Sequence, residues 1–552
     1  MRGRYNAPRL SNTCLSAFPS MKNPLEVIRL YQPHDYSLNG AFKSRLESAP
    51  DRPFILFEDV TISWREFDGK VQACAGVLAS RGIAHGDRVA VMSRNHPGHV
   101  LMLLALARLG AIMVPVNPEF GAGEARYVME HAQVAAVICS SETLAVAGEA
   151  ANGIQPSPWF ALLDQAVRDI PALNDLMAAA PVKDVKPAGT ADDTCLIVYT
   201  SGTTGFPKGA MHSQRSFVTG GEAYVQRLYV QPEDRLMIVL PLFHINALFY
   251  SVAGTLAAGC AMAIVPRFSA STFWDAAVQS GATAVNVIEA IGTILMKRPR
   301  EEFRNEHKIT KLYGARQGMI DTFRNEFHIP HLIGGYGMTE IPGVTCIPLE
   351  GPSKPGSMGP IGRHPDPARP WAQCRVVDDD GNDVGVNEAG ELLVKTPIVM
   401  QGYYRDPEQT KNAFRDGWFM TGDLVRRDAD GYFFFVSRKK DIIRRRGENI
   451  SGAELDRVIG EHPAVFEVAA IAVPSELGED EILAAIVPRP GQTVTPEEIA
   501  QWSRERLAPQ KVPRFVAIVD ELPHTPTHKI LKAKLRADTQ LRARAVDLQA
   551  VK

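Results

Sequence analysis

A loop of glycine, serine and threonine residues most strongly constrains what this chain can be. The apolar, partly β-branched run 195–199 predicts a buried strand that leads directly into the loop. Three loop glycines allow several backbone N–H groups to converge on one anion. Hydroxyl donors and one lysine suit the oxygens of a nucleoside triphosphate; these candidates are Thr200, Ser201, Gly202, Thr203, Thr204 and Lys208. The loop is not a Walker A motif, because Pro207 and Gly209 flank the lysine.

Composition excludes several classes of protein. The 552 residues carry a formal net charge of −2, which gives no support for a nucleic-acid partner. The 7 cysteines are dispersed without a Cys-x-x-Cys pair, which indicates reduced thiols and a cytoplasmic protein. The longest uncharged run, 245–266, contains asparagine, glycine and proline, so we interpret it as a core helix leading into a strand and expect no membrane span.

The order of the predicted elements indicates an α/β fold. Residues 53–67 predict a β-hairpin before a helix over 68–81, and strands at 87–92 and 111–116 flank a helix over 99–110. The alternation continues through 133–140 and 194–199, which favours a mainly parallel sheet with crossover helices. The last part predicts a small α/β domain, with strands at 466–473, 481–488 and 515–519 and a helix over 495–507.

Further motifs follow the loop in a fixed order. They are Leu240–Ala247, the turn Leu312–Arg316, Gly334–Glu340, Thr421–Asp423, Ser437–Asp441, Arg445–Ser451 and Thr525–Lys529. In Gly334–Glu340 the glycines admit a flat ring, Tyr336 offers a stacking face, and Thr339 and Glu340 supply oxygen. Mg²⁺ prefers such oxygen ligands, usually one or two protein groups together with phosphates. Glu340 is therefore the predicted metal ligand.

This ordered series resembles the AMP-forming adenylating enzymes, which include acyl-CoA synthetases, adenylation domains of nonribosomal peptide synthetases and firefly-type luciferases. The resemblance extends from about residue 40 to near the end of the chain. The run Arg445–Ser451 is similar to the subgroup of crotonobetaine/carnitine-type CoA ligases. Two positions depart from the family pattern: Arg316 replaces the usual proline, and His528 replaces the usual glycine.

The resemblance implies ATP, Mg²⁺ and coenzyme A as ligands and assigns roles to matching residues. Thr200, Glu340 and Lys529 are the implied catalytic residues. Gly314, Ala315, Tyr336, Gly337 and Thr339 would line the adenine site, with Asp423 and Arg438 on the ribose. Arg445 and Gly447 would face coenzyme A, and Asp441 would be the hinge. His244, Asn246, Ile288 and Met338 would line the acyl pocket.

The resemblance also implies how the chain divides. We expect an N-terminal extension over 1–25, a large adenylating domain of mixed, mainly parallel sheets over 26–440, and a small mobile α/β domain over 441–552. The extension is basic and lacks acidic residues, so it fits either a transit peptide or a start at Met21.

The implied function is an AMP-forming ligase that joins a small-molecule carboxylic acid to coenzyme A. The uncharged, mixed-size pocket positions favour a medium-chain, alicyclic or aromatic acid over acetate. Three alternatives stay open: a crotonobetaine/carnitine-type ligase, a stand-alone enzyme that loads a carrier protein, and a catalytically silent ATP- or acyl-binding homologue. The oligomeric state is also open, with a homodimer as one possibility.

Overall fold

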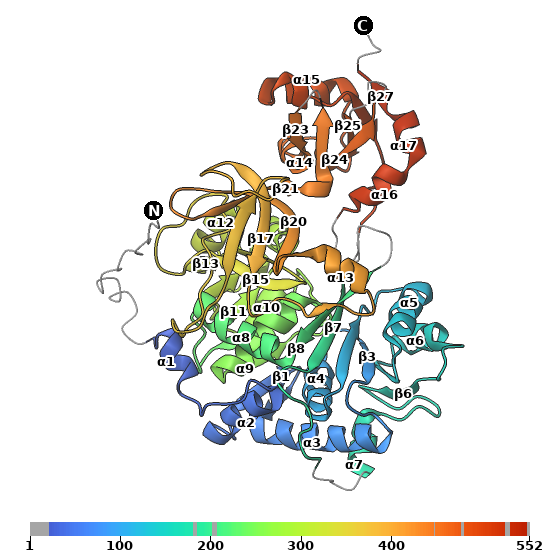
Figure 1. Cartoon of the computed structure of the whole chain (residues 1–552), viewed down its shortest axis with the longest axis vertical. Coiled ribbons are helices and arrows are strands. Elements are labelled where there is room, and N and C mark those ends of the chain that lie inside the picture. Colours follow the sequence, from blue (N-terminus) through green and yellow to red (C-terminus); the bar gives the residue numbers. More distant parts are fainter. Residues whose placement is uncertain are drawn as a thin grey trace.

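Two seven-stranded sheets form the frame of the large N-terminal domain (Figure 1). The computed structural model describes residues 21–179, 185–200, 207–445, 448–475, 480–524 and 530–548. One sheet has the order β13-β12-β11-β9-β10-β1-β2 and the other β18-β8-β7-β4-β3-β5-β6. All neighbours in the first sheet are parallel except β1–β2, and only β7–β8 and β8–β18 are antiparallel in the second. The predicted mainly parallel α/β architecture is confirmed.

The strands of these two sheets have the following bounds. In the first sheet they are β1 Pro53–Phe57, β2 Val60–Ser63, β9 Arg235–Ile238, β10 Ala261–Ile264, β11 Ala284–Asn286, β12 Lys311–Tyr313 and β13 His331–Ile333. In the second they are β3 Arg88–Met92, β4 Ile112–Val116, β5 Ala136–Cys139, β6 Trp159–Leu162, β7 Thr194–Thr200, β8 Lys208–Ser213 and β18 Gly402–Tyr403.

Helices cover these sheets, and the largest buried apolar cluster joins both sheets through α3, α4, α8 and α9. The helices of the large domain are α1 Pro24–Ile28, α2 Leu38–Ser48, α3 Trp64–Ser80, α4 Pro97–Leu109, α5 Ala122–Ala132, α6 Leu144–Ala151, α7 Leu173–Ala179, α8 Gln214–Leu228, α9 Ala253–Ala258, α10 Phe273–Ser280, α11 Glu289–Lys297, α12 Ile320–Asn325 and α13 Pro407–Ala413. A π-helical stretch, Ala247–Val252, precedes α9.

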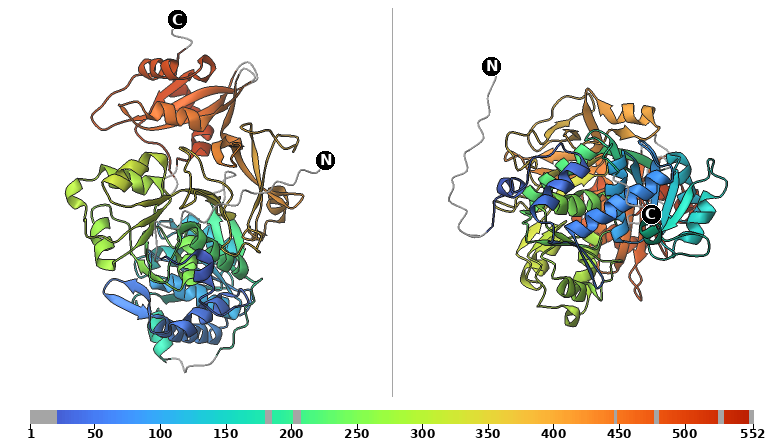
Figure 2. Two further views of the ribbon diagram at one scale, coloured as in Figure 1. Left: turned by 90° about the vertical axis from the view of Figure 1, so that its left-hand side faces the viewer. Right: turned by 90° about the horizontal axis from the view of Figure 1, so that it is seen from below.

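Smaller antiparallel units follow, and then the C-terminal domain. The strands β14 Gly335–Met338 and β15 Ile341–Cys346 form a ribbon; β16 Gln373–Val377, β17 Ala389–Lys395, β19 Phe414–Arg415, β20 Trp418–Arg427 and β21 Phe433–Arg438 form a sheet. The C-terminal elements lie together beyond β21 (Figures 1 and 2). They are β22 Ile442–Arg445, β23 Glu448–Ser451, α14 Gly452–Gly460, β24 Val465–Pro474, β25 Asp480–Pro488, α15 Pro496–Arg506, β26 Phe515–Ile518, α16 Lys532–Ala537, α17 Thr539–Arg544 and β27 Val546–Asp547. The division at residues 440 and 441 stays a prediction.

One predicted helix boundary is wrong. We expected a helix from residue 68, but α3 begins at Trp64. The Ser63 side chain accepts a hydrogen bond from the backbone N–H of Glu66, while the Glu66 carboxylate accepts one from the backbone N–H of Ser63. This capping box satisfies two N–H groups that the first helical turn leaves open, and it fixes the helix start four residues earlier than predicted.

The long uncharged run folds inside the protein, as predicted. Residues 245–266 contain the π-helical stretch, α9 and β10, and the side chains of these elements are buried. In the part of the chain that the structure describes, no helix is both long and apolar enough to cross a bilayer. The six cysteines in this part are all unbonded thiols.

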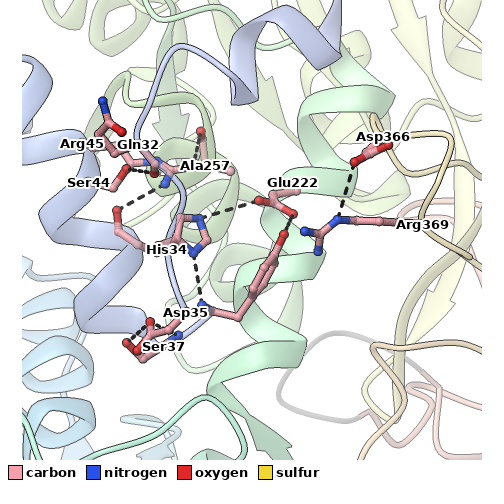
Figure 3. Close-up of polar contacts among 12 residues, drawn as sticks. Gln32, His34, Asp35, Ser37, Ser44, Arg45, Glu222, Ala257, Asp366 and Arg369 are labelled. Carbon is pink, nitrogen blue, oxygen red and sulfur yellow. Dashed lines mark hydrogen bonds and ion pairs between the residues drawn. The ribbon is translucent and has the colours of Figure 1, made fainter.

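The buried Glu222 carboxylate of α8 contacts His34 of the N-terminal segment (Figure 3), and a hydrogen bond from His364 also joins it to the loop before β16. His364 donates from Nε2 to Glu222 at 3.0 Å, the Tyr36 hydroxyl donates at 3.3 Å, and His34 Nε2 lies 3.8 Å away. Nearby, the guanidinium of Arg45 is buried and donates to the Ala257 carbonyl. These contacts join segments more than 140 residues apart in sequence.

Candidate active site

The ribbon β14–β15 places Glu340 at its turn. The Glu340 side chain is 6% exposed, and its Oε1 accepts a hydrogen bond from the Tyr403 hydroxyl at 2.8 Å. Burial raises the pKa of Glu340, although Tyr403 and the positive charges of Arg438 and Lys208 oppose that rise. The turn itself is anchored from behind, because His212 Nε2 donates to the Thr339 carbonyl at 2.8 Å. Glu340 is thus a rigidly held carboxylate with little neutralising charge.

The predicted phosphate-binding loop, residues 200–208, is held in place at both of its ends. Thr200 at the end of β7 pairs in register with Lys208 at the start of β8. On the side of α5, the Tyr127 hydroxyl donates to the Pro207 carbonyl at 3.1 Å, and His131 Nδ1 lies 2.7 Å from the Tyr199 hydroxyl. Ser201, Gly202, Thr203 and Thr204 lie outside the described residues, so their predicted phosphate contacts stay predictions.

Lys208 reaches the same region as Glu340. Its Nζ donates to Gln409 Oε1 at 2.6 Å and lies 5.0 Å from the centre of the Tyr403 ring. Burial and the charge of Lys440 lower the pKa of Lys208, while Glu340 and Asp406 oppose this. Tyr403 therefore contacts both the predicted metal ligand and the predicted phosphate-binding lysine. A cation and a carboxylate around one hydroxyl suit a metal-bound triphosphate.

The sequence analysis missed Tyr403 and Gln409. Strand β18 pairs with β8 and so brings Tyr403 beside the loop stem. Asp406 caps α13 by accepting from the backbone N–H of Gln409, which orients the first turn of that helix. The Asp-Pro pair at 406 and 407 signals a helix start in the sequence, but nothing local shows that this helix faces the loop.

The predicted adenine and ribose residues also gather at β14. The Tyr336 hydroxyl donates to Asp423 Oδ2 at 2.6 Å, and Arg438 Nε lies 3.4 Å from Asp423 Oδ1. Strand register pairs Asp423 with Arg438 directly. Burial raises the pKa of Asp423, against the opposing effects of Tyr336 and Arg438. The carboxylate predicted to hold ribose hydroxyls is thus oriented by two of the residues predicted to share its site.

Close backbone packing explains two of the candidate glycines. Gly314 has a φ of 100°, and a Cβ there would lie 1.9 Å from the Val287 carbonyl oxygen. A Cβ on Gly337 would lie 2.3 Å from the backbone nitrogen of Gly343 in the opposite strand. Neither position tolerates a side chain without backbone movement. The neighbouring Ala315 is buried.

The four predicted acyl-pocket residues differ in their exposure and in their hydrogen bonds. Asn246 Oδ1 accepts from Asn286 Nδ2 at 3.1 Å, and His244 and Met338 are half-buried. Ile288, at the N-terminus of α11, is 38% exposed. Asn286 also donates to Ser251 and accepts from the Tyr224 hydroxyl. This polar group behind Asn246 was not predicted from the sequence.

Arg445 needs a correction. We expected its guanidinium to face coenzyme A, but the side chain is buried in the C-terminal domain. It pairs with Glu481 at 2.7 Å and donates to the Gln510 and Val512 carbonyls. In this structure the guanidinium is buried and paired with a carboxylate, and it is not offered to a phosphate. A dense basic run does not reveal which of its arginines faces inward.

Asp441 lies in the 3₁₀ turn Lys439–Asp441 between β21 and β22. Its carboxylate accepts from both terminal nitrogens of Arg536, at 3.0 and 2.9 Å. Its assignment as the hinge stays a prediction. Gly447 and Lys529 lie outside the described residues, and their predicted roles likewise stay predictions.

The chain is similar to known proteins over most of its length. Residues 42–404 match the model of the AMP-binding enzyme family, and residues 454–529 match the AMP-binding enzyme C-terminal domain. An indoleacetate–CoA ligase of Aromatoleum aromaticum is 31% identical, covering 88% of this chain and 95% of its own. A crotonobetaine/carnitine–CoA ligase of Salmonella agona is 27% identical, with 88% and 96% covered.

Among solved structures, ATP-bound MatB from Rhodopseudomonas palustris superposes with a TM-score of 0.80 at 28% identity. The match covers 91% of this chain and 98% of MatB. The match to the family model spans most of the large domain and includes Glu340, Lys208 and Tyr403. The matches to the two ligases and to MatB cover 95%, 96% and 98% of those proteins' own chains. The chain therefore belongs to the AMP-binding enzyme family, whose members similar to it include acid–CoA ligases.

Proposed function

We propose that this protein is an ATP-dependent acid–CoA ligase that forms an acyl-AMP and pyrophosphate, and then an acyl-CoA and AMP. The observation that carries the proposal is the placement of Glu340 and Lys208 around Tyr403, beside the Tyr336–Asp423–Arg438 group. One half of this site suits a metal-bound triphosphate and the other half suits a nucleoside. A family match over both domains supports the same reading.

The residues present fit a magnesium ion. Glu340 supplies one buried carboxylate whose pKa is raised, which is the state of an anion that lacks a counter-charge. Within the described residues no group of three acidic, histidine or cysteine side chains could hold a metal alone. Mg²⁺ commonly binds one or two carboxylates and completes its shell with substrate phosphates and water. When bound, it would supply charge neutralisation for the departing pyrophosphate.

The residues of the chain would act mainly by positioning and electrostatics. Asp423 and Arg438 would hold the ribose, and the stems at Thr200 and Lys208 would hold the phosphates. The substrate carboxylate attacks the α-phosphorus, and the bond to pyrophosphate breaks. Lys529 would steady the charge on the α-phosphate. No side-chain nucleophile is needed in this scheme.

We propose that the C-terminal domain then turns about Asp441, so that the thiol of coenzyme A can attack the acyl-AMP. The position of Asp441 in a short turn between β21 and β22 supports this. A turn absorbs changes in φ and ψ without disrupting either neighbouring strand. The unbonded cysteines agree with a cytoplasmic location for the enzyme.

The test is release of pyrophosphate and AMP from ATP across a panel of carboxylic acids, with and without coenzyme A. Indoleacetate, crotonobetaine and carnitine belong on the panel because of the relatives described above. Product formation that requires coenzyme A supports the proposal. Acyl-AMP formation with no effect of coenzyme A would point to a carrier protein as the acceptor, and binding of ATP without any turnover would indicate a silent homologue.

A further inference from the structure

Arg227 is a buried cation without an acidic partner among the described residues. Its side chain lies on α8 and is 3% exposed. Nη2 donates to the Gly343 carbonyl at 2.6 Å, and Nε and Nη1 have no acceptor in hydrogen-bond geometry among the described residues, although the guanidinium also interacts with the Tyr250 hydroxyl. Aromatic rings partly compensate, because the guanidinium lies 5.6 Å from the Tyr250 ring centre and 5.3 Å from that of Trp371. Rings do not accept the in-plane N–H groups.

Trp371 adds a third donor of the same kind. This residue is 6% exposed, and its Nε1 also has no acceptor in the described part of the chain. Two neighbouring side chains thus leave three donor nitrogens buried without acceptors in the described part of the chain. An unsatisfied buried donor costs free energy, and an unpaired buried cation costs more. A ligand with anionic oxygens would satisfy all three donors and the charge together.

Arg45, another buried arginine whose Nε makes no hydrogen bond, differs from Arg227. Its Nη1 and Nη2 both donate to carbonyl groups, and Glu222 supplies a nearby negative charge. A small cavity of about 10 Å³ borders Arg45, which is close to the volume that one water occupies. Arg45 therefore has carbonyl acceptors and a nearby carboxylate, whereas Arg227 has no acidic partner among the described residues.

Arg227 lies against the ribbon that carries the reaction site. A Cβ on Gly343 would lie 2.0 Å from Arg227 Nη1, so only glycine allows this contact. Gly343 in turn faces Gly337, next to Met338 of the predicted acyl pocket. Tyr250 links the two sides, because its hydroxyl lies beside Gly337 and its ring beside Arg227.

The distance between Glu340 and Gly343, which contacts Arg227, sets the length of a molecule that could reach both Glu340 and Arg227. Glu340 and Gly343 are three residues apart at the start of β15, which is about 10 Å of extended strand. Behind this line, Tyr224, Tyr250 and Tyr313 pack ring against ring with centroids 5.1 to 5.6 Å apart. A cation beside aromatic rings suits an acidic group that is carried on an apolar molecule.

We propose that Arg227 and Trp371 bind a second acidic group of the substrate, so that the enzyme activates dicarboxylic acids whose two carboxylates are separated by an apolar chain or an aromatic ring. This inference rests on the proposed function, and it names the substrate class of the same site. One carboxylate would react with ATP while the other pairs with Arg227 and accepts from Trp371.

The experiment compares kcat/KM for matched acids, measured as pyrophosphate release with ATP and coenzyme A. The pairs are octanedioate with octanoate and terephthalate with 4-methylbenzoate, in which a methyl group replaces the second carboxylate. We expect each diacid to exceed its partner by at least about 10-fold, because a site built for a polar group discriminates strongly against its absence.

Three variants distinguish a substrate-binding role of Arg227 from a purely structural role. Arg227→Met should lower kcat/KM for the diacids by about 100-fold and for the monoacids by less than about 3-fold. Trp371→Phe keeps a ring and removes one N–H, so it should lower the diacid value by about 5-fold. Arg45→Met, the matched buried arginine on α2, should affect both kinds of acid equally. If Arg227→Met does not fold, the comparison of diacids with monoacids in Trp371→Phe still tests the proposal.

Each outcome decides the question. A preference for diacids that falls selectively in Arg227→Met or Trp371→Phe supports the proposal. Equal or better turnover of the monoacids by the unmodified protein overturns it, and so does an equal loss for both acids in the variants; in these cases the ligase function stands. No pyrophosphate release with any acid, including indoleacetate, rejects the ligase function and the inference together.

Discussion

Two buried glutamates, Glu222 on α8 and Glu340 at the β14–β15 turn, show how the surroundings of a carboxylate separate structure from function. Both side chains are nearly inaccessible, with 4% and 6% exposed. Burial raises the pKa of each, but at Glu222 the hydrogen bond from His364 and the nearby positive charges outweigh burial and lower it. At Glu340 burial prevails and the pKa stays raised.

The difference lies in the number of donors. The Nδ1 atoms of His34 and His364 accept backbone N–H groups, so both rings carry a proton on Nε2, directed at Glu222. The Tyr36 hydroxyl is a further donor. Glu340 has Tyr403 as its side-chain donor. A saturated carboxylate holds segments together, whereas an undersaturated one is available to a cation.

Removing the Glu222 carboxylate, which several donors surround, should have the largest effect, and this effect is on stability. Glu222→Ala leaves its donors buried without an acceptor and the buried Arg45 charge without a nearby carboxylate, so we expect a loss of about 3–5 kcal/mol in the free energy of unfolding. Urea denaturation measures it. The control, Glu47→Ala, removes an exposed partner of Lys43 and should change stability by less than about 0.5 kcal/mol. Equal losses in the two variants would contradict the structural role of Glu222.

Replacing the undersaturated carboxylate should affect activity instead. Glu340→Gln should lower the rate of acyl-AMP formation by about 100- to 1,000-fold, because the buried negative charge that would hold the cation is lost. ATP–pyrophosphate exchange measures this rate. Glu350→Gln, an exposed change on the same segment, should leave it unchanged.

The stability of the Glu340 variant provides a second test of the difference between Glu222 and Glu340. The folded state raises the pKa of Glu340, so its ionised form opposes folding at pH 7. Glu340→Gln should therefore unfold at the same or a higher urea concentration than the unmodified protein. A loss of stability similar to that of Glu222→Ala would show that Glu340 is mainly structural.

The Glu222 cluster should respond to acid through His34. Burial and Arg45 lower the pKa of His34 to about 4, below its usual value near 6.5. Between these values the unfolded chain binds more protons than the folded one, so stability falls as the pH falls from 6.5 to 4. His34→Gln should reduce this slope by at most about 1.4 kcal/mol per pH unit, measured by urea unfolding at several pH values. An unchanged slope would contradict the assignment of a neutral His34.

Removing the Tyr403 hydroxyl, the side-chain donor to Glu340 among the described residues, should have the smallest effect on activity. Tyr403→Phe should lower kcat/KM by about 3- to 10-fold and change the Mg²⁺ concentration needed for half-maximal activity, since one hydrogen bond is worth about 1 kcal/mol. Tyr432→Phe is the control, because it removes a hydroxyl that donates to the Pro352 carbonyl away from this site. The same Mg²⁺ dependence in both variants would exclude a role for Tyr403 beside the metal.

The sequence by itself determined the parts that depend on neighbours along the chain. The loop at 200–208, the turn at 334–340 and the Thr-Gly-Asp at 421–423 carry their chemistry in short runs, so their order identified the family. Alternating apolar strands and helices likewise predicted the parallel sheets. The start of α3 was missed, because the capping box at Ser63 and Glu66 was not considered.

Only the tertiary structure decided which side chains are partnered. Tyr403 reaches Glu340 from 63 residues away and Gln409 reaches Lys208 from 201 residues away. Arg445 and Arg227 are both arginines in mixed sequence, yet one is paired with Glu481 and the other has no acidic partner among the described residues. Burial and pairing arise when distant segments pack, and local patterns do not encode them. The same residue type therefore becomes a structural element in one place and a candidate binding group in another.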